Sequence, residues 1–145
     1  GHFGAVVGWT KYATQWHNKV MQQVFKTRHF ARWMRKTDLT DQALCEAVDE
    51  MSRGLIDADL GGGVMKERGG RAGRGKRGGA KTLDATDKGN RWFFVFGFEK
   101  SERANVASDE LAALQDIAAD LLGRTTGALD AAVQDGALQE ICHGH

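Results

Sequence analysis

A continuous segment from Val64 to Lys100 constrains this chain more than any other part of its sequence. It begins with a basic, glycine-rich run and ends with the most apolar run of the chain, WFFVFGF at 92–98. Positions 66–81 hold seven Lys or Arg and one acid, a formal charge of about +6, whereas the whole chain carries +1. A concentrated cationic segment beside an aromatic strand is typical of surfaces that hold polyanions.

The length and composition predict one globular domain. A chain of 145 residues can bury a core without disulfides or metal, and 41% hydrophobic with 27% charged residues is ordinary for such a domain. Residues 1–20 begin with Gly1-His2, as a cleaved purification tag does, and show no clear period. We therefore expect a tag scar or leader outside the fold, followed by a single domain over 21–145.

The cysteines and the hydropathy pattern favour a cytoplasmic protein. Cys45 and Cys142 lie far apart in no metal-binding spacing. We interpret Cys45 as a small core residue on a helix face and Cys142 as a residue near the chain end, which fits a reducing compartment. No apolar run approaches the roughly 20 residues of a membrane span, so we expect no membrane partner.

The order of apolar periods and caps predicts an α+β fold. We expect a small, mostly antiparallel sheet with two N-terminal helices and C-terminal helices, in the order β-α-α-β-β-β-α-α. Aromatic residues on both faces of 91–98 predict a central strand. The tail 137–142 forms either a final strand or a frayed end.

The expected boundaries follow from local signals. They are a strand at 22–27; a helix carrying Phe30, Trp33 and Met34; a helix capped by Thr40 and ended by Gly54; strands at 64–68, 80–86 and 91–98, the last two joined by a turn in which Gly89 and Asn90 tolerate positive φ; a helix capped by Ser108, ended by Gly123 and buried through Leu111, Leu114, Ile117, Ala118 and Leu121; and a shorter helix capped by Thr125 or Thr126.

No motif calls for a cofactor or a metal. The GxGxxG match at 73–78 precedes a strand, whereas a pyrophosphate site requires a helix N-terminus. The near P-loop at 70–77 has Arg77 where a Ser or Thr must reach magnesium. The histidines form no ligand set, and we interpret His29, a lone residue beside an apolar stripe, as structural or idle.

The cationic run itself supports two interpretations. Arginine forks bind phosphate in bidentate fashion, lysines supply point charge, and glycines let the backbone approach a polyanion. The same composition is typical of a flexible loop that binds nucleic acid loosely and does no chemistry. Composition alone leaves both open.

Two motifs add a family resemblance. They are Gly75-Lys76-x-Gly78-Gly79 and Phe98-x-Lys100-x-Glu102-Arg103-Ala104-Asn105. With them, the stretch from Val24 to the end of the third helix resembles the RelE/HigB-like toxins of bacterial type II toxin–antitoxin systems, in the RelE/ParE superfamily. The resemblance implies a microbial-RNase-like fold, cleavage of mRNA in the A site of the small ribosomal subunit, and a cognate antitoxin as partner.

The resemblance also implies roles for the basic residues. In the family's chemistry the ribose 2′-OH attacks the adjacent phosphate, and cations stabilise the charge that develops. The catalytic candidates are Arg68, Lys76, Lys81, Lys100 and Arg103. The RNA-binding candidates are Lys66, Arg71, Arg74 and Arg77.

Two positions depart from the family pattern. Ala80 stands where the family often has an aromatic ring that can stack on a base, and Lys81 stands where it has an arginine that can clamp phosphate. We therefore predict a ribosome-dependent mRNA interferase, which these two departures would weaken or inactivate. The alternatives are a ParE-like gyrase inhibitor and a nucleic-acid-binding protein without catalysis.

Overall fold

The computed structural model describes residues 22–68 and 79–142 and confirms the α+β class. The expected leader at 1–20 lies outside these residues. The elements are β1 (Gln23–Thr27), α2 (Arg28–Met34), α3 (Asp41–Ser52), β2 (Ala58–Gly61), β3 (Val64–Arg68), β4 (Ala80–Thr86), β5 (Arg91–Glu99), α4 (Ser108–Leu122), α5 (Thr126–Asp135) and β6 (Leu138–Ile141).

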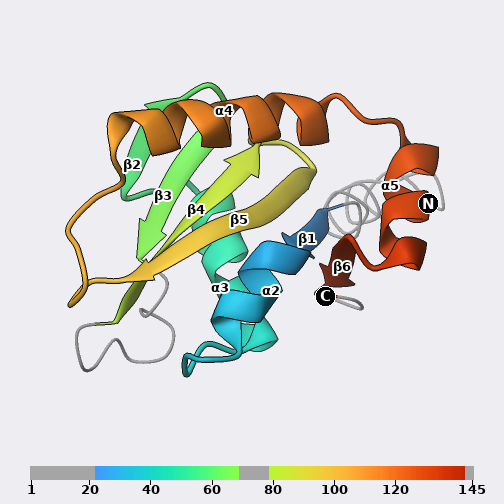
Figure 1. Cartoon of the computed structure of the whole chain (residues 1–145). Coiled ribbons are helices and arrows are strands. Elements are labelled where there is room, and N and C mark those ends of the chain that lie inside the picture. The colour runs from blue at the N-terminus through green and yellow to red at the C-terminus, as the bar shows by residue number, and fades with distance from the viewer. Residues whose placement is uncertain (1–21, 69–78, 143–145) are drawn as a thin grey trace, which may run out of the picture.

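A six-stranded sheet of order β2-β3-β4-β5-β1-β6 forms the centre of the fold. Strands β2 to β5 run as an antiparallel meander, while β1 pairs with β5 in parallel and with β6 in antiparallel orientation. Helix α4 lies over one face of the sheet, and α2 and α3 lie over the other (Figure 1). The sheet thus separates two hydrophobic cores.

Strand β5 is the central strand that its aromatic residues predict. Phe93 faces the core under α4, where it stacks on Phe25 with ring centroids 5.1 Å apart. Trp92 and Phe94 face the core under α2 and α3. Each ring is at most 1% exposed, and burying a side chain of this size stabilises the fold by about 1.5–3 kcal/mol. These rings make β5 the rigid support of the sheet.

The helix caps follow the sequence signals with one exception. The hydroxyls of Thr40 and Thr125 accept hydrogen bonds from the backbone N–H three residues on, at 3.1 and 3.0 Å. The expected cap at Ser108 is wrong, because Ala107 is the N-cap of α4 and Ser108 its first helical residue. The carboxylate of Glu110 accepts the N–H of Ala107 at 2.9 Å, so the acid replaces the missing cap hydroxyl.

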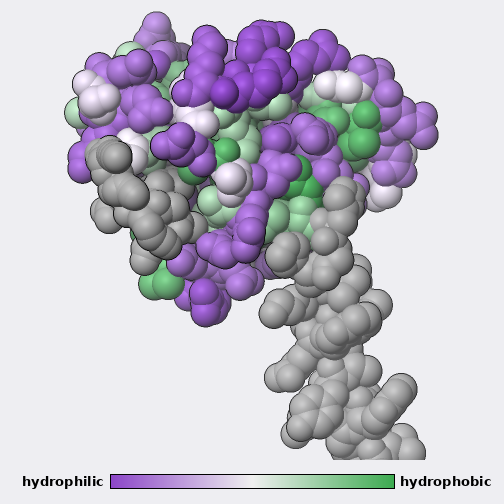
Figure 2. Space-filling model, turned by 90° about the horizontal axis from the view of Figure 1, so that it is seen from below, coloured by the Kyte–Doolittle hydropathy of each residue, from purple (hydrophilic) through white to green (hydrophobic). Residues whose placement is uncertain are grey.

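One face of the molecule shows the character of the exposed surface. Seen from below, hydrophilic residues cover most of the described surface, with smaller apolar areas between them (Figure 2).

Ile117 is 43% exposed, so its predicted place in the buried face of α4 is wrong. The buried stripe consists of Leu114, Ala118 and Leu121, and Ile117 lies at its edge since each residue turns the helix by about 100°.

One strand and one turn differ from the predicted structure. β2 was not predicted, because this short edge strand alternates only between half-buried and exposed positions. In the turn after β4 the positive φ, +64°, falls on Lys88 and not on Gly89 or Asn90. The hydroxyl of Thr86 accepts the Lys88 N–H at 2.9 Å, which supports that backbone conformation. The tail does form a final strand, β6.

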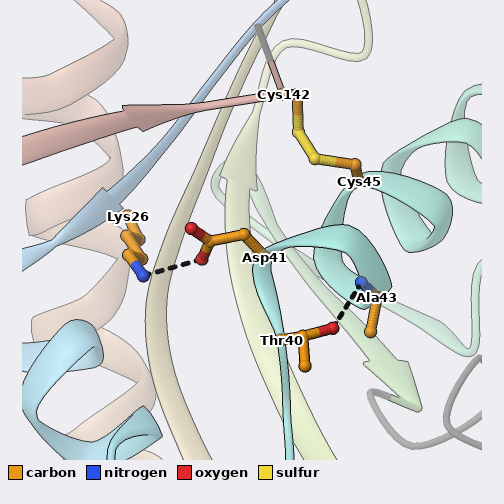
Figure 3. Close-up of a disulfide and its surroundings, with 6 residues drawn as sticks. All are labelled: Lys26, Thr40, Asp41, Ala43, Cys45 and Cys142. Atoms are coloured by element: carbon orange, nitrogen blue, oxygen red, sulfur yellow. Dashed lines mark hydrogen bonds and ion pairs between the residues drawn. A yellow bond between two sulfur atoms is a disulfide. The ribbon is translucent and has the colours of Figure 1, made fainter.

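Cys45 and Cys142 form a disulfide, so the interpretation of two unpaired cysteines is wrong. The bond joins α3 to the residue after β6, and its Cα atoms are 5.6 Å apart although 97 positions separate them in the sequence (Figure 3). In the same region Nζ of Lys26 contacts Oδ1 of Asp41 at 2.7 Å, linking β1 to the first turn of α3 (Figure 3). The spacing of the two cysteines in the sequence cannot reveal this pairing, because the pairing depends on β6 lying beside β1 in the sheet.

Candidate functional site

Strand register brings basic residues of β3 and β4 together on one face of the sheet. Lys66 lies opposite Leu83, which lies opposite Phe96. Two residues along, Lys81 lies opposite Phe98. Because alternate residues of a strand share a face, these side chains lie on the α4 side of the sheet. We call the set Lys66, Lys81, Phe96, Phe98 and Arg103 the cationic face.

Arg103 reaches this face from the turn that follows β5. Its guanidinium carbon lies 5.4 Å from the ring centroids of both Phe96 and Phe98, within the range of cation–π attraction. Its Nη1 donates to Oε1 of Glu110 at 2.6 Å. That hydrogen bond, followed by the one from the Ala107 amide, lowers the pKa of Glu110. Glu110 is therefore an anion at neutral pH and holds the guanidinium over the rings.

The two lysines of the face also have intramolecular partners. Nζ of Lys81 contacts Oδ2 of Asp57 at 3.3 Å, with side chains 17% and 29% exposed. Nζ of Lys66 donates to Oδ1 of Asn105 at 3.0 Å. Each cation of the face is thus held in position by an acid or an amide, which comes from the residue before β2, the loop after β5 or the first turn of α4.

The other predicted site residues divide into two groups. Lys100 is exposed and follows β5, and its backbone N–H donates to the carbonyl of Gly79 at 3.3 Å, next to the start of β4. Arg68 ends β3, with its Cα opposite that of Lys81. The remaining candidates lie outside the described residues: Arg71, Arg74, Lys76 and Arg77.

The acid within the basic run points away from the cationic face. Glu67 follows Lys66 in β3, so its side chain points to the opposite face of the sheet, the side that α2 and α3 cover. It is 4% exposed there. It shares that side with the fully buried Asp84. Burial, and next the charge of Glu67, raise the pKa of Asp84 well above its ordinary value. On β3 and β4, Lys66 and Lys81 thus lie on one face of the sheet and Glu67 and Asp84 on the other.

Ala80 faces the same way as these carboxyl groups. It alternates with Lys81 and is 5% exposed. A ring at position 80 would therefore lie on the opposite side of the sheet from Lys81. The expectation that Ala80 removes a stacking surface from the polyanion site stays a prediction, and such a ring would not share the face of Lys81 because strand alternation separates the two positions.

Sequence reasoning missed the residues that restrain the cations. Asp57 reaches Lys81 only through the pairing of β2 with β3, and that strand was not predicted. Asn105 lies within the quoted family motif, but no local pattern links it to Lys66. Glu110 carried a usable signal, since an acid at the third position of a helix commonly accepts the N-cap amide.

The chain also resembles a family of known proteins. In residues 22–68 and 79–142 no helix has the length and apolarity of a membrane span, and no cluster of His, Cys, Asp or Glu suits a metal ion. No curated protein matches the chain. A family model described as "RelE toxin of RelE / RelB toxin-antitoxin system" matches residues 22–141.

Proposed function

Because the chain belongs to the RelE toxin family, we propose that it is a ribosome-dependent endonuclease that cleaves mRNA. The observation that carries this proposal is the cationic face. Lys66, Lys81 and Arg103 lie there on one face of the sheet, and the Arg103 guanidinium lies over two aromatic rings. A rigid array of cations of this kind suits a reaction in which charge develops on phosphate.

The proposed reaction is attack of a ribose 2′-OH on the adjacent phosphate. The bond to the 5′-oxygen breaks, which leaves a 2′,3′-cyclic phosphate and a 5′-OH. Arg103 would bind two phosphate oxygens through its fork of donors, while Lys66 and Lys81 would act as point charges. These groups stabilise the transition state because charge on the phosphate oxygens is greatest there.

Binding of RNA requires the cations to exchange partners. Lys81 would leave Asp57, and Arg103 would leave Glu110, when phosphate oxygens arrive. Partly exposed ion pairs of this kind are worth only about 0–1 kcal/mol, so the exchange costs little. The intramolecular partners thus orient the cations without blocking them.

We also propose a cytoplasmic location and an antitoxin that covers the cationic face. The matched family is defined by a toxin–antitoxin system, which implies a cognate antitoxin. Acidic side chains of such a partner could replace Asp57 and Glu110 on the cations. Bound antitoxin should then exclude RNA, and a competition assay with labelled RNA tests this.

The test of the proposed function is expression in bacteria with mapping of mRNA 5′ ends. We expect Lys81→Ala and Arg103→Ala each to reduce cleavage by about 10²–10³, the typical cost of one lost transition-state donor. The matched control is Lys88→Ala, since Lys88 also pairs with an acid, Asp59, at 3.1 Å, but lies in the turn between β4 and β5. The control should cleave like the parent.

Two outcomes would replace this function with another. Growth arrest without new mRNA ends, together with inhibition of gyrase supercoiling in vitro, would support the ParE-like alternative. RNA binding without growth arrest, cleavage or gyrase inhibition would support a nucleic-acid-binding protein that does no chemistry.

A further inference from the structure

One aromatic contact extends the cationic face onto α2. The imidazole of His29 is parallel to the ring of Phe96 within 5°, with ring centroids 6.0 Å apart. His29 is exposed and belongs to neither hydrophobic core, and Phe96 is only partly buried. An exposed planar ring therefore lies directly beside the ring that carries the Arg103 guanidinium.

The fold explains why this histidine lies there. β1 runs parallel to β5, and the last pair in their register is Lys26 with Phe94. The chain then turns into α2 at Arg28, so the first turn of the helix takes the place beside Phe96 that a longer β1 would occupy. His29 thus extends the row that begins with Lys66 on β3 and crosses Leu83 and Phe96.

We propose that His29 and Phe96 form a stacking platform for one nucleobase of single-stranded RNA. The inference rests on the proposed function and names how the same site holds its substrate. A base stacked on the imidazole would place its phosphate toward Lys66, Lys81 and Arg103, because the ring of Phe96 and these cations lie on the same face of the sheet. Stacking accepts any base, since every base presents a flat face.

The other rings near the cationic face cannot serve in this way. Phe98 also lies under Arg103 but is 3% exposed, so no base can cover it. Position 80 holds alanine and faces the opposite side of the sheet from Lys81. Among the described residues, His29 is the exposed ring that adjoins the cations.

The experiment compares binding of two short RNA probes to the intact protein. One probe is a single-stranded hexanucleotide with 2-aminopurine at one position, whose fluorescence falls when the base stacks. The other is an abasic oligomer of the same length and charge. The variants are His29→Ala, which removes the ring; His29→Phe, which keeps a planar ring; and Lys81→Ala, which removes a cation.

We expect His29→Ala to weaken binding of the base-bearing probe by about 5- to 10-fold, the lower end of stacking on one base. It should also abolish the fluorescence quenching while leaving the abasic probe unaffected. His29→Phe should retain both binding and quenching. Lys81→Ala should weaken both probes alike, since it acts on phosphate.

Two results would overturn the platform in distinguishable ways. If the parent binds both probes but His29→Ala binds and quenches the base-bearing probe as the parent does, the cations hold RNA and His29 does not. If the parent binds neither probe at low salt, the platform fails, whereas the proposed function is decided separately by the mRNA ends mapped in bacteria. Circular dichroism of each variant checks that the exposed substitution leaves the fold intact.

Discussion

We expect single acidic residues to adjust how strongly the cationic face, the proposed RNA site, attracts RNA. Asp57 holds Lys81 at 3.3 Å, and its carboxylate competes with any phosphate for that amine. We expect Asp57→Asn to raise affinity for single-stranded RNA by about 2- to 5-fold, because a partly exposed ion pair is worth up to about 1 kcal/mol.

Filter binding across a salt series measures this effect. Asp59→Asn is the matched control, as it removes the same charge from a pair with Lys88 at 3.1 Å in the turn after β4. Equal gains from both substitutions would mean that net charge, and not the restraint on Lys81, sets the affinity.

A second acidic residue affects stability. Burial and the nearby Glu67 raise the pKa of Asp84 well above its ordinary value of 3.8. The folded protein therefore binds this proton more tightly than the unfolded chain, and the free energy of unfolding falls as pH rises above about 3.8. The slope for one group is at most about 1.4 kcal/mol per pH unit.

Asp84→Asn should accordingly stabilise the protein at pH 7, with a gain that shrinks toward pH 4. Urea denaturation at several pH values checks this. The exposed Asp116 on α4 offers the control substitution, Asp116→Asn, which should change the unfolding free energy little. A gain for Asp84→Asn that does not depend on pH would contradict the assignment.

At the scale of elements, α2 docks on β5 through a glycine. A Cβ at Gly97 would lie 2.3 Å from Cζ3 of Trp33, closer than atoms can approach. Trp33 also contacts Phe30, at a centroid distance of 5.3 Å, so the indole has little freedom to move. The absence of a side chain at position 97 is what lets α2 lie against the strand and carry His29 beside Phe96.

Gly97→Ala should therefore destabilise the protein by about 1–3 kcal/mol, the usual cost of overpacking a core. It should also weaken binding of base-bearing RNA if α2 shifts. Gly127→Ala in α5 provides the comparison, since its Cβ would meet only one atom, at 4.0 Å, and alanine favours helix. Equal stability of the two variants would show that α2 can move without cost.

At the scale of the whole molecule, the disulfide closes most of the chain into a loop. Cys45 and Cys142 are 97 positions apart, and crosslinks of native domains contribute about 2–5 kcal/mol, mainly by restricting the unfolded chain. We expect a reductant, or the double variant Cys45→Ser/Cys142→Ser, to lower the unfolding free energy by that amount.

Denaturation with and without reductant is the measurement, and the double variant should not respond to the reductant. Cleavage should persist, because both cysteines border the core under α2 and α3 and not the cationic face. The cytoplasm keeps most thiols reduced. In the proposed location the protein would therefore work with the disulfide reduced, in its less stable form. An unchanged unfolding midpoint in reductant would contradict a stabilising role for the bond.

The sequence by itself determined the parts of this protein that depend on neighbours along the chain. Thr40 and Thr125 cap helices because a hydroxyl reaches an amide three residues away. The aromatic alternation of 91–98 identified a strand covered on both faces, since side chains of a strand point to opposite sides in turn. The basic run and the motif after β5 also supplied Lys66, Lys81 and Arg103 as candidate site residues.

Only the tertiary structure decided which residues meet across the sheet. Strand order placed β1 beside β5 and β6, which brought together two cysteines that no local pattern connects. Strand register turned Lys66 and Lys81 toward one face and Ala80 toward the other. Asp57, Asn105 and His29 contact Lys81, Lys66 and Phe96 from 24 to 67 positions away. Such contacts between distant segments depend on how the whole core packs.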